Sequence, residues 1–210
     1  LNDTLALNDK TALIEYLSRI GWLDLAIIAA NRAELVDLLH IRFPAPFLET
    51  FQRHAFQTGI PVNFLLAIAR QESAFNATAV SSANALGLMQ LLLPTAQQTA
   101  NRIRFKKPSK PNLFDPRINI KLGSHHLAGL MQQFNNNRVL TAAAYNAGAR
   151  RVKNWLKKSN GIPTTVWIES IPFHETRNYV KNVIAFSYVY SARLGTDQPV
   201  WHAHELNIPD

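Results

Sequence analysis

The sequence contains no cysteine, which excludes a disulfide framework, a thiolate zinc site and a cysteine nucleophile. It also lacks an apolar run of the ~18–20 residues that a membrane-spanning helix needs. Even the stretch LDLAIIAA is interrupted at once by Asn31 and Arg32. Eight glycines, eleven prolines and no repeat of fixed period exclude collagen-like and linker-rich architectures. A folded globular chain is the class that remains.

Motifs for metals and nucleotides are missing as well. HExxH spacing does not occur, and His125 and His126 are adjacent, so on a helix they point in different directions. The GxxxxGK[ST] phosphate loop is also absent. We therefore expect no metal site and no cofactor.

Acidic residues are scarce relative to basic ones. Twenty-two Lys and Arg against fourteen Asp and Glu give a net charge of +8, which suits an anionic partner such as nucleic acid, an acidic glycan or a membrane surface. The basic residues gather in the 102–110 loop and in a cluster of Arg150, Arg151, Lys153, Lys157 and Lys158. Charge alone is a weak signal, and no nucleic-acid motif accompanies it, so we expect no nucleic-acid partner.

Apolar residues make up 47% of the chain and recur at three- and four-residue spacing, whereas alternating strand patterns are scarce. We predict a mainly α protein, with helices over 47–57, 62–73, 94–103, 118–134, 139–158 and 175–194. Residues 5–40 are predicted to form two or three short helices. Pro44 and Pro46 disfavour helix in the residues before them, so we place a domain boundary between 1–45 and 46–210. The opening LNDTLALNDK has no export signal.

Glu72 is the candidate for chemistry. In the predicted 62–73 helix it shares a face with Leu65 and Ile68, and an apolar surrounding raises the pKa of a carboxyl group. A glutamic acid that keeps its proton near neutral pH can act as the general acid for a glycosidic bond. The structural alternative is that Glu72 ends the helix paired with Arg70.

Downstream motifs make the pattern specific. They are Glu72-Ser73, Phe75-Asn76, Ser81, Gly87-Leu88-Met89-Gln90, Thr95-Ala96, Asp115-Pro116, Asn119-Ile120, Gly123, Ala144-Tyr145-Asn146-Ala147-Gly148, Arg151-Val152, Ile171-Pro172-Phe173, Glu175-Thr176-Arg177 and Tyr179-Val180. In order and spacing, the chain from Pro46 to Leu194 resembles the catalytic domain of the large, periplasmic soluble lytic murein transglycosylases. Residues 1–45 are more loosely similar to the end of the α-superhelical linker of that family.

The resemblance implies a lysozyme-like (goose-type) catalytic domain that acts on peptidoglycan glycan strands in the periplasm. Such enzymes cleave the β-1,4 bond between N-acetylmuramic acid and N-acetylglucosamine without water and leave a 1,6-anhydro ring. One glutamate, here Glu72, acts first as acid and then as base. The substrate's N-acetyl oxygen takes the place of the second carboxylate that most glycoside hydrolases use.

The resemblance also implies roles for individual residues. Tyr145 would lie beside Glu72, its hydroxyl donating to the carboxylate or steadying the acetamido group. The expected substrate-binding residues are Ser81, Met89, Gln90, Leu92, Asn146, Glu175 and Tyr179. Structural alternatives stay open: Ser81 and Gln90 as caps, Asn146 as a loop brace, Glu175 paired with Arg177, and both tyrosines as core residues.

The chain departs from the family pattern around the expected groove. The family usually has other residues at Ala77, Asn84, Leu86, Leu92, Leu93, His126, Ala149 and Arg150, with tyrosine common at the position of His126. None of these changes removes the acid. We expect Leu86 to narrow the groove and Asn84 to accept a left-handed backbone. The alternatives to a transglycosylase are a muramidase, in which Glu175 or another acid activates water, and a non-catalytic peptidoglycan-binding module.

Overall fold

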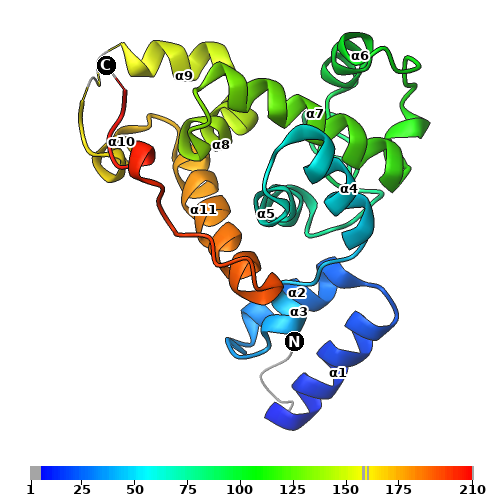
Figure 1. The fold of residues 1–210 in the computed structure, drawn as a ribbon. Helices are drawn as coiled ribbons and strands as arrows, with labels where there is room; N and C mark the ends of the chain where they lie inside the picture. The colour runs from blue at the N-terminus through cyan, green and yellow to red at the C-terminus, as the bar shows by residue number, and fades with distance from the viewer. Residues whose placement is uncertain (1–5, 158, 160, 210) are drawn as a thin grey trace.

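The computed structural model describes residues 6–157, 159 and 161–209, and helices dominate it (Figure 1). In chain order the α-helices are α1 (Leu7–Arg19), α2 (Leu23–Arg32), α3 (Leu39–Arg42), α4 (Leu48–Thr58), α5 (Val62–Ser73), α6 (Leu93–Arg102), α7 (Pro116–Gln133), α8 (Arg138–Ala147), α9 (Ala149–Leu156), α10 (Thr164–Ser170) and α11 (His174–Leu194). Short 3-10 helices follow Lys110 (η1, Pro111–Phe114) and His202 (η2, Ala203–Glu205). The described residues contain no β-strand, only isolated bridges such as Val80–Leu86 and Leu86–Leu91. The predicted mainly α class is confirmed.

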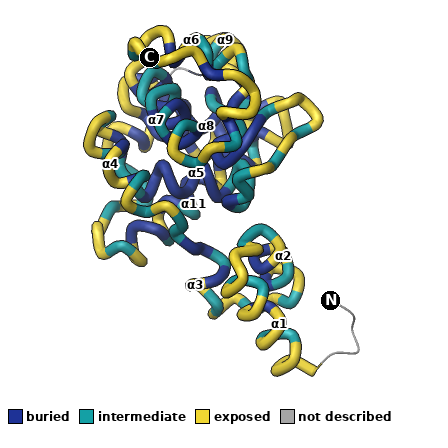
Figure 2. Tube along the Cα trace, turned by 90° about the vertical axis from the view of Figure 1, so that its right-hand side faces the viewer, coloured by how far each residue is buried: buried dark blue, intermediate teal, exposed yellow. Residues whose placement is uncertain are grey.

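Helix α5 lies at the centre of the larger core. It begins directly after Pro61, whose fixed backbone suits a helix start, and every residue from Asn63 to Arg70 is buried. A helix that is buried on all sides must be enclosed by other elements, and α11 and α4 pack against α5 (Figures 1 and 2). Glu72 lies two residues beyond the buried stretch and within the same helix, so the core fixes the position of its backbone.

Helices α1 to α3 form a small cluster below the main body (Figures 1 and 2). They have a core of their own, made of Ile14, Ala26, Ala30 and Ile41. The chain then enters the main body at the Phe43–Pro46 segment, where the Tyr190 hydroxyl donates to the Pro44 carbonyl oxygen at 2.7 Å. The assignment of residues 1–45 to a linker stays a prediction, and residues 1–5 lie outside the described residues.

Two features of the C-terminal half differ from the predicted pattern. The single helix predicted over 139–158 is two helices, α8 and α9, because Gly148 between them has a φ of 89°. Helix α10, whose Trp167 is buried, was not predicted. Lys158, which belongs to the second basic cluster, lies outside the described residues.

The chain after α11 folds back along the body to α8 and α10 (Figure 1). Its anchor is Glu205, fully buried, whose carboxylate accepts hydrogen bonds from the Arg138 guanidinium and backbone N–H. The Thr164 hydroxyl donates to the Glu205 carbonyl oxygen at 2.5 Å. This contact fixes the start of α8, the helix that carries Tyr145 and Asn146. Among the described residues, no helix combines the length and apolar character needed to cross a membrane.

Candidate active site

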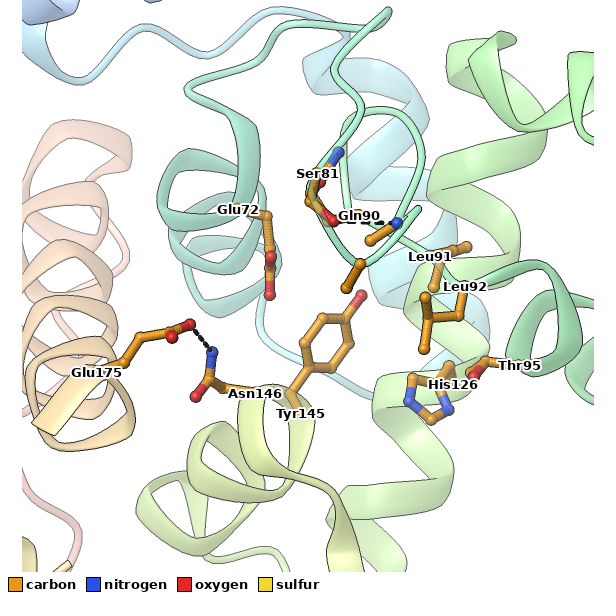
Figure 3. Close-up of a pocket in the computed structure, with 12 residues that line it drawn as sticks. Glu72, Ser81, Gln90, Leu91, Leu92, Thr95, His126, Tyr145, Asn146 and Glu175 are labelled. Carbon is orange, nitrogen blue, oxygen red and sulfur yellow. Dashed lines mark hydrogen bonds between the residues drawn. The ribbon is translucent and has the colours of Figure 1, made fainter. Parts of the chain in front are cut away.

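An open pocket lies where the ends of α5, α8 and α11 face the 81–95 segment and α7 (Figure 3). It is lined by Glu72, Ser81, Ala83, Ala85, Gln90, Leu91, Leu92, Thr95, His126, Tyr145, Asn146 and Glu175. Seven of the nine predicted site residues therefore line the pocket: Glu72, Ser81, Gln90, Leu92, Tyr145, Asn146 and Glu175. Met89 and Tyr179 lie behind the wall.

The Glu72 carboxyl group is the chemical centre of the pocket. It follows the fully buried Leu65 and Ile68 on the same face of α5, as predicted. The Tyr179 hydroxyl donates to Glu72 Oε1 at 2.7 Å. Burial raises the pKa of Glu72 from its ordinary value of 4.5 to about 7; the Tyr179 hydrogen bond opposes this shift, and the Glu175 charge adds to it. Glu72 can therefore both hold and release a proton near neutral pH.

The hydrogen bond to Glu72 that was predicted for Tyr145 is made by Tyr179. The Tyr145 hydroxyl donates to the Met89 carbonyl oxygen at 2.8 Å, so the predicted hydrogen bond to the Glu72 carboxylate is wrong. Tyr179 is only 4% exposed and makes that bond instead. Tyr179 does not line the pocket, which agrees with the alternative that it is a core residue, and its predicted contact with sugar stays a prediction. Buried tyrosine hydroxyls need a partner, and each of these has found one.

The turn over residues 87–90 forms one wall of the pocket, and Asn119 holds it from beneath. This fully buried amide accepts from the Met89 N–H at 2.8 Å and donates to the carbonyl oxygens of Leu86 and Leu113. Gly87 has a φ of 74°, and a Cβ there would lie 2.2 Å from the Leu113 oxygen. Only glycine fits at this position. The motif residues Gly87 and Asn119 thus shape the wall without entering the pocket.

Met89 itself does not face the pocket. Its side chain is fully buried against Gly123, where an added Cβ would lie 2.4 Å from its Sδ atom. The Met89 side chain therefore does not line the pocket, and the predicted substrate-binding role of Met89 stays a prediction; its observed contribution is the carbonyl oxygen that accepts from Tyr145. Leu86 is likewise buried, in a satellite core, so it does not narrow the groove. Asn84 has the predicted left-handed backbone, with a φ of 60°.

Ser81 and Gln90 each brace the loop they occupy. The Ser81 hydroxyl accepts from the Ala85 N–H at 3.0 Å. The Gln90 amide donates to the carbonyl oxygens of Ala79 and Gly87. Both side chains also line the pocket (Figure 3), so the capping role and a place in the groove occur together.

Asn146 links α8 to the start of α11. Its amide donates to Glu175 Oε1 at 3.2 Å, and its oxygen accepts from the Thr176 hydroxyl at 2.6 Å (Figure 3). Glu175 is exposed at the pocket edge. Its alternative pairing with Arg177 does not form, because Arg177 lies 3.9 Å from the Glu169 carboxylate.

The alternative pairing of Glu72 with Arg70 is also wrong. The Arg70 guanidinium turns away from the pocket and donates to the Arg42 carbonyl oxygen at 2.8 Å. It also lies over the rings of Phe43 and Phe186, where burial lowers its pKa to about 10. No basic side chain among the described residues forms an ion pair with Glu72.

Five pocket residues were not among the predicted site residues: Ala83, Ala85, Leu91, Thr95 and His126. Thr95 belongs to a quoted motif, and His126 was noted only as a departure from the family. Both are helical, and the sequence gives no signal for which face of α6 or α7 meets the pocket. Among the described residues, no group of three or more His, Cys, Asp or Glu side chains could hold a metal ion.

The helices packed around a central buried helix, with a single protonatable glutamate at its end, define a lysozyme-like fold with an open groove. Comparison with known proteins then specifies the family. Residues 49–168 match the transglycosylase SLT domain, and residues 170–199 match the soluble lytic transglycosylase helical domain. The chain belongs to the transglycosylase SLT domain family.

The relatives extend this likeness over nearly the whole chain. A putative soluble lytic murein transglycosylase of Haemophilus influenzae is 42% identical over 209 residues, covering 99% of this chain and 35% of that protein. Solved structures of lytic transglycosylase Slt from Pseudomonas aeruginosa (an inactive mutant) and of the 70 kDa soluble lytic transglycosylase from Escherichia coli align with TM-scores of 0.94 and 0.92. Their identities are 39% and 38%, and each alignment covers 99% of this chain and 34% of the other. The chain thus spans about a third of the length of these relatives.

Proposed function

We propose that this chain is the catalytic part of a periplasmic lytic transglycosylase. It would cleave the β-1,4 bond between N-acetylmuramic acid and N-acetylglucosamine in peptidoglycan and form a 1,6-anhydro end. The names of its relatives and the family match support the substrate class. The single observation that carries the mechanism is Glu72, a half-buried carboxyl group with a pKa of about 7 in an open groove.

The first step uses Glu72 as an acid. Its proton passes to the glycosidic oxygen, the bond from that oxygen to C1 breaks, and the N-acetylglucosamine side leaves as an alcohol. Tyr179 occupies Oε1 of the carboxyl group. No described residue bonds to Oε2, which is therefore the oxygen that can carry the proton. The substrate's acetamido oxygen bonds to C1 and takes up the positive charge.

The second step uses Glu72 as a base. The carboxylate removes the proton from the 6-hydroxyl of the muramoyl residue, O6 bonds to C1, and the acetamido oxygen is released. This restores the protonated Glu72 and consumes no water. The Tyr179 hydrogen bond stabilises the carboxylate between the two steps, because hydrogen bonds to a charged acceptor are stronger than those to a neutral one.

The second carboxylate in the pocket, Glu175, supports this single-acid mechanism better than hydrolysis. It is exposed and held by the Asn146 amide, so nothing about its surroundings favours an activated water. A muramidase would need such a carboxylate to act as base or nucleophile. The products distinguish the two reactions directly.

Cleavage of purified glycan strands in H₂¹⁸O tests the proposal. A transglycosylase gives anhydro products that are lighter than the reducing-end products by one water and that contain no ¹⁸O. A muramidase gives reducing-end muramic acid carrying ¹⁸O. A non-catalytic module leaves the strands intact while still binding them.

Replacing Tyr179 by Phe should shift the pH profile upward. The lost hydrogen bond stabilised the carboxylate, so the pKa of Glu72 rises above about 7. The fall of kcat/KM on the alkaline side, which reports loss of the Glu72 proton, should move to higher pH by about one unit. Measuring kcat/KM on soluble glycan strands between pH 4 and 9 locates this alkaline fall.

Tyr145→Phe is the matched control, since the Tyr145 hydroxyl bonds to the Met89 carbonyl oxygen and not to Glu72. For this variant, the alkaline fall of kcat/KM should occur at the same pH as in the unmodified protein, even if the maximal rate changes. If the alkaline fall for Tyr179→Phe stays in place or moves to lower pH, the assigned hydrogen bond does not govern the acid.

A basic lobe, defined as residues 102–121, adjoins the pocket through α6. Its cations are Arg102, Arg104, Lys106, Lys107, Lys110, Arg117 and Lys121, against one acid, Asp115. None of these cations forms an ion pair among the described residues. We infer that the lobe attracts the stem-peptide carboxylates of peptidoglycan.

Reversing Arg104, Lys106 and Lys107 to Glu should therefore weaken binding to isolated cell-wall sacculi about tenfold at low salt. The difference should shrink as salt screens the charges. A triple reversal of Arg19, Arg32 and Arg53 changes the net charge equally outside the lobe, so it should weaken binding much less. Equal losses for the two variants would show that only net charge matters. Sedimentation with sacculi across a salt series measures both.

A further inference from the structure

His126 lies in the pocket on the far side of Tyr145 from Glu175 (Figure 3). It comes from the middle of α7, and its ring is 5.4 Å from the Tyr145 ring, tilted by 52°. The Tyr145 hydroxyl is committed to the Met89 carbonyl oxygen. That end of the pocket is therefore left with few polar groups, set among the aliphatic side chains of Leu91 and Leu92.

The ring nitrogens of His126 are available to a ligand. Neither makes a hydrogen bond to another described residue, and neither is among the described buried polar atoms that lack a partner. They therefore reach the open space of the pocket. Thr95, on the neighbouring helix α6, likewise has no side-chain hydrogen bond within the described part of the chain and lines the same end.

The charge state of the ring limits what it can bind. Burial, and secondarily the Arg102 guanidinium, lowers the pKa of His126 to about 4, so the ring is neutral above pH 5. A neutral imidazole offers one N–H donor and one lone-pair acceptor. Hydroxyl and acetamido groups offer the same pair in return, whereas a carboxylate could use the donor only.

We propose that His126 is a substrate-binding residue that holds a neutral substituent, a hydroxyl or acetamido group, of a sugar at the end of the groove away from Glu175. This inference rests on the proposed function for the identity of the strand, but the contact requires only a glycan. It concerns binding and not the chemical step, because the hydrogen bond to the Glu72 carboxyl group comes from Tyr179 and not from His126. The tilted contact with the Tyr145 ring helps to hold the imidazole in place.

Binding of a neutral glycan tests the contact without turnover. In a Glu72→Gln background, calorimetry with the N-acetylglucosamine hexamer should show an about tenfold weaker Kd for His126→Phe, which keeps the ring but loses both hydrogen-bonding atoms. His126→Gln keeps a donor and an acceptor and should stay within about threefold. His125→Phe is the matched control: the same change on the next residue of α7, which lines a separate pocket, should leave Kd unchanged.

The kinetic readout separates binding from a structural role. On glycan strands, His126→Phe should raise KM about tenfold and leave kcat within about twofold. Unchanged hexamer binding with weaker binding of peptide-bearing strands alone would mean that His126 reads a stem-peptide carboxylate, and it would overturn the proposal. So would a fall in kcat at unchanged KM. Thermal unfolding of each variant confirms that it is folded, and His126→Ala serves if the larger ring unfolds the chain.

The two proposals fail in different ways. If the unmodified protein forms no anhydro product but His126→Phe still weakens hexamer binding, the enzyme assignment falls and the His126 contact stands. If anhydro product forms and the hexamer binds His126→Phe as it binds the parent, the His126 contact falls and the enzyme assignment stands.

Discussion

Glu72→Gln should abolish formation of anhydro ends, lowering kcat on glycan strands by about a thousandfold or more. Glutamine has nearly the same shape as glutamic acid, but it can neither give a proton to the glycosidic oxygen nor take one from the 6-hydroxyl. The Tyr179 hydroxyl can still donate to the amide oxygen, so the pocket keeps its geometry. Binding of glycan strands should therefore stay within a few-fold of the unmodified protein.

Glu175→Gln is the control that separates the reaction types. In the single-acid mechanism it removes an exposed carboxylate at the pocket edge and should lower the rate far less than Glu72→Gln. In a two-carboxylate hydrolase the two variants would be equally damaging. If the Glu72→Gln protein still released anhydro products, the acid would be another residue. If the unmodified protein bound the strands but did not cleave them, the chain would be a binding module only.

Glu205→Gln should cause the largest loss of stability, about 3–5 kcal/mol in the free energy of unfolding at pH 7. The change leaves the Arg138 guanidinium, 4% exposed, buried without its counter-charge. Burial raises the pKa of Glu205, but hydrogen bonds from Arg138 and two backbone N–H groups outweigh it and the net pKa is lowered. The stabilisation from this pair is thus present above the ordinary glutamate pKa and is lost as pH falls below it.

Urea unfolding at pH 7 and at pH 3 measures both parts of this expectation. The deficit of Glu205→Gln should be full at pH 7 and smaller at pH 3, because below the ordinary glutamate pKa the unfolded parent gains a proton that the folded parent, with its lowered pKa, binds less readily. Glu169→Gln, which removes an exposed partner of Lys181, should change the unfolding midpoint little. A Glu205→Gln protein as stable as the parent would show that the C-terminal segment does not hold α8 in place.

Much of the fold could be predicted from the sequence because its helices have clear limits. The 62–73 helix, with Pro61 before it and apolar residues throughout, was predicted with the bounds that α5 has. The break at Gly148 was missed because apolar spacing continues across it, although its φ of 89° ends α8. Helix α10 was missed because Thr164–Ser170 is too short to show a period.

The site was predicted in composition but not in its hydrogen bonds. Helical spacing placed Glu72 with Leu65 and Ile68, which is a local property of one helix. The choice of Tyr179 over Tyr145 as the partner of Glu72 depends on how α11 packs against both α5 and α8, and no local pattern contains that geometry. The direction of the Met89 side chain could not be predicted for the same reason: the residue lies in a motif of the wall, and its side chain packs against Gly123.

The ionisation of Glu72 tests the central claim most directly. With ¹³C-labelled glutamate, the carboxyl signal that disappears in Glu72→Gln can be followed by NMR from pH 3 to 9. The account predicts a midpoint near 7, where the side chain can both give and take a proton. A midpoint near the ordinary 4.5 would contradict it, because the group would then be ionised before the sugar arrived.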